Sequence, residues 1–217
     1  MGEYKEARQQ MVDTQIRTTD VTAYNVLEAF LKVPRELFVP ASLRTLSYSD
    51  ADIKISDSRS MTQPSPLAKL LQLADMNKDD LVLIIGSNTG YSAALASQLA
   101  NTVVAVENTE ALATKAETII SDLGYDNVAV ISGDLAEGMP SEGPYDVIFI
   151  EGAVEEIPQK LLDQLKDGGH LITVDGAARR AEAIKILRTG DHFSRMSAFD
   201  TNAPVLPEFR KHVSFDF

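Results

Sequence analysis

Hydrophobic positions change their spacing near residue 80 of the chain. Before it, apolar residues recur three and four positions apart, as over residues 26–31, which predicts helices with one buried face. After it, residues 81–85 form a continuous apolar run, the pattern of a parallel strand covered on both faces. We therefore expect a helical segment, residues 1–77, packed on a core of residues 78–217 within one structural domain.

Strands and helices are predicted to alternate along the core. The predicted strands are residues 81–85, 102–106, 127–132, 145–150 and 170–174. The predicted helices are residues 91–100, 110–123 and 158–165. Such alternation builds right-handed β-α-β units, so the fold class is α/β with a doubly wound, Rossmann-like, mostly parallel sheet. Two more strands, 193–199 and 211–217, have no helix between them and predict an antiparallel hairpin at one sheet edge.

Composition and charge narrow the functional classes. The 217 residues are 44% hydrophobic and 24% charged, which is ordinary for a globular domain, and the formal net charge is −12. A protein that binds nucleic acid needs a basic face, so nucleic acid is excluded as a general partner. The chain has no cysteine and three scattered histidines, so no metal site is expected. The longest apolar runs are too short to span a bilayer, and we expect a cytoplasmic protein with no membrane partner.

Residues suited to an adenosine ligand follow three consecutive predicted strands. Gly86 and Gly90 bracket a loop that opens a helix, where the backbone can approach a ligand closely. Glu107 ends the second strand, where its carboxylate can accept hydrogen bonds from ribose hydroxyls. Asp134 follows the third strand and could accept from an adenine amino group. Each residue alone has a simpler explanation as a turn or helix cap, but together they favour a nucleoside site at the carboxyl edge of the sheet.

The loop chemistry distinguishes among adenosine ligands. Ser87 and Asn88 stand where a dinucleotide fingerprint requires bare glycine backbone, and no P-loop lysine follows. An acidic protein suits a ligand with a sulfonium and an ammonium better than one with phosphates. S-adenosylmethionine is therefore the ligand that fits best.

Short stretches along the chain share the pattern of one known family: residues 11–17, 33–40, 62–64, 90–94, 123–128, 133–134 and 161–165. Through them the chain resembles the protein-L-isoaspartate O-methyltransferase family over nearly its whole length. The N-terminal stretch and the Val-Pro-Arg-Glu segment are specific to that family rather than to methyltransferases in general.

The resemblance implies methyl transfer from S-adenosylmethionine to the carboxylate of L-isoaspartyl residues, with S-adenosylhomocysteine as product. The acceptors would be damaged proteins or peptides, and the role would be protein repair. Thr62 matches the family's acceptor-contacting hydroxyl, with Ser60 beside it. The donor-binding residues expected on this basis are Gly86, Ser87, Gly90, Tyr91, Glu107, Asn108, Asp134, Leu135 and Glu151.

The chain departs from the family pattern at both halves of the site. Ile84 stands where the family has an acid that helps to hold the methionine end of the donor, and losing such a charge-assisted bond costs roughly 1.5–3 kcal/mol, about ten- to a hundredfold in affinity. Residues 58–61 lack the usual glycine. Glu151 begins a Glu-Gly-Ala stretch where the family has threonine and alanines. Since the first and fourth strands are neighbours, Glu151 could replace the missing acid; alternatively, it is a surface acid that caps a turn.

Three functions therefore stay open. The first is an isoaspartyl methyltransferase, and the second is a methyltransferase with another carboxylate substrate. The third is a family member that has lost efficient donor binding and acts as a non-catalytic binding protein.

Overall fold

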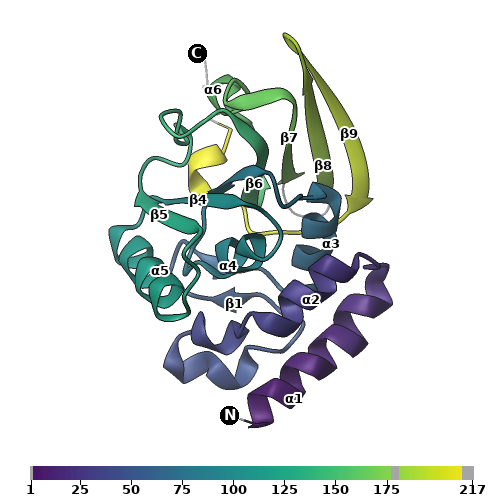
Figure 1. The fold of residues 1–217 in the computed structure, drawn as a ribbon, viewed down its shortest axis with the longest axis vertical. Coiled ribbons are helices and arrows are strands. Elements are labelled where there is room, and N and C mark those ends of the chain that lie inside the picture. Colours follow the sequence, from purple (N-terminus) through teal and green to yellow (C-terminus); the bar gives the residue numbers. More distant parts are fainter. Residues whose placement is uncertain (1, 177–180, 212–217) are drawn as a thin grey trace, which may run out of the picture.

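A seven-stranded sheet forms the centre of the computed structural model, which describes residues 2–176 and 181–211 (Figure 1). Its strand order is β5-β4-β3-β6-β7-β8-β9; the first five in this order are parallel, and β8 and β9 run antiparallel. The strands are β3 (Leu81–Ile85), β4 (Thr102–Glu107), β5 (Val128–Ser132), β6 (Tyr145–Val154), β7 (Leu165–Asp175), β8 (Glu182–Thr189) and β9 (His192–Asp200). The expected doubly wound α/β class with an antiparallel edge hairpin is confirmed.

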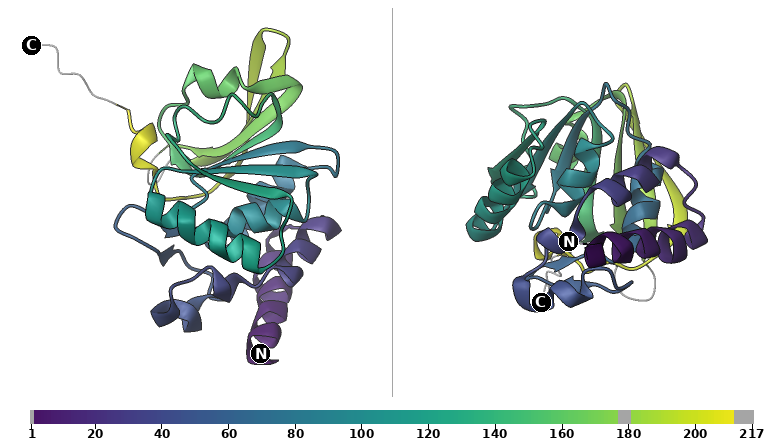
Figure 2. Two further views of the ribbon diagram at one scale, coloured as in Figure 1. Left: turned by 60° about the vertical axis from the view of Figure 1, so that its left-hand side comes forward. Right: turned by 60° about the horizontal axis from the view of Figure 1, so that its bottom comes forward.

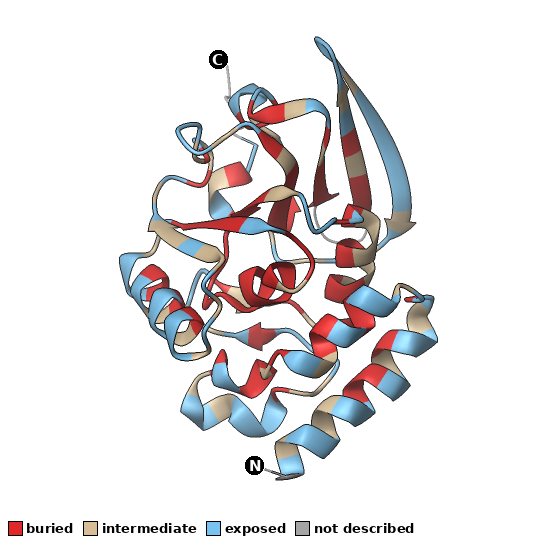
Figure 3. Ribbon diagram, in the orientation of Figure 1, coloured by how far each residue is buried: buried red, intermediate tan, exposed pale blue. Residues whose placement is uncertain are grey.

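The central strand β3 explains the continuous apolar run. It lies between β4 and β6, with Ile85 aligned with Val106 on one side and Ile150 on the other. Its side chains alternate between two hydrophobic clusters, one on each face of the sheet, and Ile84 and Ile85 belong to different clusters. The central strands are accordingly buried along almost their whole length (Figure 3).

Helices cover both faces of the sheet, and Figure 2 shows the N-terminal helices gathered below it. The α-helices are α1 (Gly2–Met11), α2 (Tyr24–Lys32), α3 (Pro64–Ala74), α4 (Tyr91–Ser97), α5 (Glu110–Asp122) and α6 (Gln159–Leu162). Short helical turns span Val12–Ile16, Arg17–Thr19, Arg35–Leu37, Ala41–Leu46 and Pro207–Phe209. One hydrophobic cluster includes residues from α2, α3 and α4 together with β3 and β6, so the N-terminal helices and the sheet share a core.

A small hairpin that the sequence did not suggest crosses the N-terminal segment. Its strands, β1 (Ile53–Lys54) and β2 (Ser60–Met61), pair antiparallel, and Ile53 and Met61 are buried. Two-residue strands are too short to produce a recognisable alternation of polar and apolar positions. The hairpin holds residues 58–62 against the carboxyl edge of the main sheet.

The edge hairpin contains a strand that was not predicted. Strand 193–199 is confirmed within β9, and β9 pairs antiparallel with β8. Gly190 adopts φ 58° in the two-residue turn between them, and such a conformation is typical of tight hairpins. Of the predicted strand 211–217 the structure describes only Lys211, which is not in a strand; the remainder lies outside the described residues.

Helices at two places end earlier than predicted. α4 ends at Ser97 rather than Ala100, and α6 ends at Leu162, because β7 already begins at Leu165. Gly168 and Gly169 come just before the predicted strand 170–174, but in the structure they lie inside β7. The strand is longer than its apolar part, so its polar beginning carried no strand signal.

After β9 the chain returns to the carboxyl edge of the sheet through residues 204–209, here called the returning segment. Val205 forms a parallel bridge with Ala153 of β6, and the amide of Leu206 donates to the carbonyl of Ala153 at 3.0 Å. Leu206 and Phe209 are buried. The returning segment therefore covers the edge where the sequence predicts a ligand site.

Candidate functional site

The carboxyl ends of β3 and β6 meet the hairpin and the returning segment around one small cavity, and the end of the neighbouring strand β4 lies beside it. Because these three strands are neighbours, the residues that follow them come together although they are far apart in sequence. The cavity is lined by Ser58, Arg59, Ser60, Thr62, Gly86, Asn88, Glu151, Gly152, Pro204, Val205 and Leu206.

The loop after β3 has the backbone that a tight turn into a helix requires. Gly86 and Gly90 have φ values of 74° and 91°, and the amide of Gly86 donates to the carbonyl of Val106 at 2.9 Å. Asn88 also adopts a positive φ, 56°, which asparagine tolerates better than most residues. Both polar atoms of the Asn88 side chain and the Ser87 hydroxyl are buried without a hydrogen-bond partner. Unpartnered buried polar atoms of this kind fit a polar ligand beside the loop.

Glu107 is fully buried at the end of β4, and its carboxylate accepts hydrogen bonds from within the protein. The amide of Asn88 donates to Oε2 at 2.9 Å, and the amide of Thr109 donates to Oε1 at 3.1 Å. The third donor is Nε of Arg59, 3.3 Å from Oε1. The predicted ribose-binding carboxylate does not line the cavity itself; it lies behind Asn88 and Arg59, which do, and it is already paired with the arginine.

Arg59 belongs to a group that sequence reasoning missed, here called the arginine cluster: the buried Arg59 and Glu107, the partly buried Glu208 and the exposed Asn108. Arg59 is only 3% exposed, and its Nη2 donates to Asn108 Oδ1 at 2.6 Å and to Glu208 Oε1 at 3.1 Å. The Asn108 amide also donates to Glu208, at 2.6 Å. The absence of glycine in residues 58–61 was the available signal, but the acid from the returning segment could not be foreseen.

Glu151 is buried in β6 rather than exposed in a turn, so its interpretation as a surface cap is wrong. Its carboxyl accepts a hydrogen bond from the Ser92 hydroxyl at the start of α4. Burial raises the pKa of Glu151 to about 7, and the Ser92 hydrogen bond and the charge of Arg35 oppose that rise. In register Ile84 faces Phe149, so Glu151 lies two residues further along the same sheet face, a diagonal neighbour of the position without an acid.

Arg35 holds the acceptor-side hydroxyl segment in place. Its Nε donates to the carbonyl of Ser47 and its Nη2 to the carbonyl of Thr62, both at 2.8 Å. Thr62 is buried, Ser60 is partly buried, and both line the cavity. The guanidinium stacks over Tyr91 at 4.8 Å from the ring centroid. Of the predicted acceptor and donor residues, the structure thus brings Ser60, Thr62, Gly86 and Glu151 to this cavity.

Three predicted donor residues lie differently from the rest. The ring of Tyr91 packs edge-on against Phe38, and its side chain does not line the cavity. Asp134 is exposed, and its Oδ1 accepts from the amide of Ala136 at 2.8 Å, which is a local turn cap. Leu135 is buried in the hydrophobic cluster of the opposite sheet face. An adenine contact by Asp134 or Leu135 stays a prediction.

The site has hydrogen-bonding groups suited to S-adenosylmethionine, but it does not have enough free volume to hold the molecule. Carboxylates from Glu107 and Glu151 and the unpartnered Asn88 amide suit its hydroxyl and cationic groups. The free cavity measures about 10 Å³, whereas small-molecule sites usually measure about 300–1,000 Å³. Leu206 fills the mouth, since a Cβ on Gly152 would come within 2.6 Å of its side chain. The chemistry therefore fits the ligand, while this closed conformation does not admit it.

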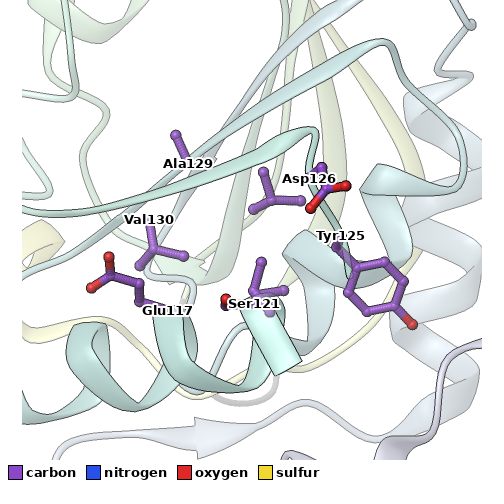
Figure 4. Close-up of a pocket in the computed structure, with 8 residues that line it drawn as sticks. Glu117, Ser121, Tyr125, Asp126, Ala129 and Val130 are labelled. Carbon is purple, nitrogen blue, oxygen red and sulfur yellow. The ribbon is translucent and has the colours of Figure 1, made fainter. Parts of the chain in front are cut away.

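A larger groove lies elsewhere, between α5 and the edge strand β5 (Figure 4). It has a volume of about 330 Å³ and is lined by Glu117, Ile120, Ser121, Tyr125, Asp126 and residues 128–130. None of the predicted site residues lines it. Over residues 2–176 and 181–211, no group of side chains could hold a metal ion, and no helix is long and apolar enough to cross a bilayer.

The fold and the residues at these strand ends define a methyltransferase-type α/β protein. A sequence profile described as protein-L-isoaspartate(D-aspartate) O-methyltransferase (PCMT) matches residues 6–199. The chain belongs to this family.

Relatives agree along most of the chain. The protein-L-isoaspartate O-methyltransferase of Syntrophus aciditrophicus is 35% identical over 196 residues, 90% of either chain. Protein-L-isoaspartate O-methyltransferase 2 of Shewanella sediminis is 40% identical over 169 residues, 78% of this chain and 69% of its own. A solved protein-L-isoaspartate O-methyltransferase superposes with a TM-score of 0.81 at 28% identity, covering 91% of this chain and 65% of that one.

A second solved structure supports the fold. A Plasmodium falciparum protein described as a protein-L-isoaspartate O-methyltransferase, in complex with S-adenosyl-L-homocysteine, superposes with a TM-score of 0.78 at 18% identity. The alignment covers 94% of this chain and 98% of that chain.

Proposed function

We propose that this chain transfers a methyl group from S-adenosylmethionine to the carboxylate of L-isoaspartyl residues in proteins or peptides, and that the reaction serves repair of damaged proteins in the cytoplasm. The observation that carries the proposal is that Glu151 and Thr62 line one cavity in a chain of this family, with Glu107 directly behind it, bound to the cavity-lining residues Asn88 and Arg59. The net charge of −12 is consistent with a peptide acceptor rather than nucleic acid.

The reaction requires positioning more than acid–base chemistry. S-adenosylmethionine supplies a methyl group that its sulfonium already activates, and the acceptor carboxylate is already ionised at neutral pH. The protein must align the two in line and exclude water. Thr62 and Ser60 can donate hydrogen bonds to the acceptor, and Arg35 fixes the Thr62 backbone. Neither a nucleophilic triad nor a metal ion is needed for this chemistry.

Glu107 and Glu151 bind opposite ends of the donor in this proposal. The Glu107 carboxylate accepts from the ribose hydroxyls once Arg59 has left it. Glu151 replaces the acid missing at Ile84 and accepts from the ammonium of the methionine end. Because a cation favours the ionised carboxylate, donor affinity should increase as the pH rises through about 7.

Calorimetric titration of S-adenosylmethionine into the wild type and Glu151→Gln tests the Glu151 assignment. We expect the variant to bind about ten- to a hundredfold more weakly at pH 8, with a smaller difference at pH 6. Equal affinity of the two proteins at pH 8 contradicts the assignment.

Incubation with methyl-labelled S-adenosylmethionine and an isoaspartyl peptide tests the activity itself. The matched control is a peptide of the same sequence with an ordinary aspartyl residue, and we expect methyl ester only on the isoaspartyl form. Ester on both peptides, or on another carboxylate compound alone, supports a methyltransferase of different substrate. No ester, together with no donor binding at millimolar concentration, refutes the enzymatic proposal.

A second function is favoured by one specific observation. Arg59 pairs with the carboxylate proposed to bind the ribose, and Ile84 stands where the family has an acid. Both differences would weaken donor binding, as expected for a non-catalytic binding protein. In that case neither the wild type nor a variant with an opened cavity binds the donor.

A further inference from the structure

Arg59 occupies the position that the proposed function gives to the donor's ribose. Its guanidinium lies 3.3 Å from Glu107 Oε1 and 3.5 Å from Oε2, the carboxylate oxygens to which ribose hydroxyls would donate. The side chain reaches this position from the hairpin, about 48 residues away in sequence. A ligand and Arg59 cannot both pair with the same face of Glu107.

The returning segment holds Arg59 in this position from the other side. Glu208 accepts from Arg59 Nη2 at 3.1 Å, and Asn108 accepts from the same nitrogen at 2.6 Å. Leu206 packs over the glycine loop, since its side chain lies 3.3 Å from the position a Cβ on Gly86 would take. The two parts that fill the cavity, Arg59 and Leu206, are thus linked through the returning segment.

The closed arrangement leaves polar groups unsatisfied that a ligand could satisfy. Asn88 is 3% exposed, lines the cavity, and has neither of its side-chain polar atoms paired. Oε2 of Glu208 is buried without a partner as well. The closed form therefore combines a strong charge-assisted contact with unsatisfied buried donors and acceptors, which favours exchange with an open form.

We propose that Arg59 is an internal competitor of the donor's ribose and sets the affinity of the chain for S-adenosyl ligands; this inference rests on the proposed function. In the closed form Arg59 pairs with Glu107 and Glu208. In the open form Arg59 and the returning segment move away and the ribose takes over Glu107. The apparent dissociation constant is then the intrinsic one divided by the fraction of molecules that are open.

Calorimetric titration with S-adenosylhomocysteine tests the competition without relying on activity. Arg59→Ala removes the competitor, and we expect about 10- to 100-fold tighter binding, since hydrogen bonds to a charged group no longer oppose opening. Glu208→Gln is the milder second variant. It leaves Glu107 and Arg59 in place but removes the second acid, and we expect tighter binding by a smaller factor.

Arg195→Ala is the matched control, because Arg195 on β9 also pairs with two acids, Asp175 at the end of β7 and Glu182 of β8, and none of the three lines the cavity. It should bind S-adenosylhomocysteine like the wild type. Thermal unfolding without ligand checks that each variant is folded before titration.

The outcomes separate this inference from the proposed function. The competition is supported if Arg59→Ala or Glu208→Gln binds S-adenosylhomocysteine more tightly than the wild type does. It is also supported if a variant binds and the wild type shows no measurable binding. If the wild type binds and both variants bind equally or more weakly, the competition is refuted while donor binding stands. If neither the wild type nor either variant binds at millimolar ligand, the competition and the proposed donor site are both refuted.

Discussion

Replacing Glu151 by glutamine should remove a pH dependence of stability that originates in one buried carboxyl group. Burial raises the pKa of this group to about 7, whereas its ordinary value is 4.5. Between these two values the folded chain binds more protons than the unfolded chain, so the free energy of unfolding falls as the pH rises. The stabilising contribution is complete below pH 4.5 and is lost as the pH rises through about 7.

The difference between the ordinary pKa of 4.5 and the raised pKa of about 7 corresponds to about 3 kcal/mol in the free energy of unfolding, since one pKa unit is worth about 1.4 kcal/mol. Glu151 is only 7% exposed, so screening by solvent reduces this little. For a chain of this length about 3 kcal/mol corresponds to roughly 6–12 °C in Tm. Glutamine keeps the shape and can still accept from Ser92, but it does not titrate.

Urea unfolding followed by circular dichroism, in steps from pH 4 to 8.5, measures the effect. The wild type should become less stable relative to Glu151→Gln as the pH rises, with most of the change between about pH 4.5 and 7. Glu117→Gln, an exposed acid on α5, is the control and should follow the wild type. A constant difference between wild type and Glu151→Gln across this range refutes the assignment of a raised pKa to Glu151.

Two further predictions concern stability, measured by urea unfolding. Arg35→Ala should lower the free energy of unfolding by about 3 kcal/mol, because the carbonyls of Ser47 and Thr62 lose a charged hydrogen-bond donor. A loss under about 1 kcal/mol would contradict this prediction. Gly152→Ala should lower the free energy of unfolding by about 1–3 kcal/mol, because the added Cβ would lie 2.6 Å from the Leu206 side chain. Gly124→Ala is the control: its Cβ would have open space, and the variant should lose only about 1 kcal/mol through backbone strain. Equal losses for the two alanine variants would show that the contact with Leu206 is relieved easily.

The parallel part of the sheet could be predicted because its signals are local. The apolar run at residues 81–85 and the glycines that follow it indicate a buried strand and a turn within a few residues. Strand ends then place Glu107 and Glu151 at one edge, since neighbouring parallel strands bring their carboxyl ends together. This is why the position of the candidate site followed from the sequence.

The contents of the site could not be predicted in the same way. Arg59, which pairs with Glu107, also pairs with Glu208, 149 positions away along the chain, and nothing in either neighbourhood indicates the other. The pairing of β9 with β8 was not predicted for a similar reason, because the residues of one strand do not specify which strand it pairs with. Long-range contacts between polar side chains carry no periodic pattern that sequence analysis can use.

The returning segment also has a consequence for which parts of the chain control access to the cavity. The described strands of the main sheet begin at Leu81 and end at Asp200. Arg59 precedes this range, and Leu206 and Glu208 follow it. Residues outside the sheet therefore decide whether a ligand can enter, and the sheet itself can stay unchanged while access to the cavity changes.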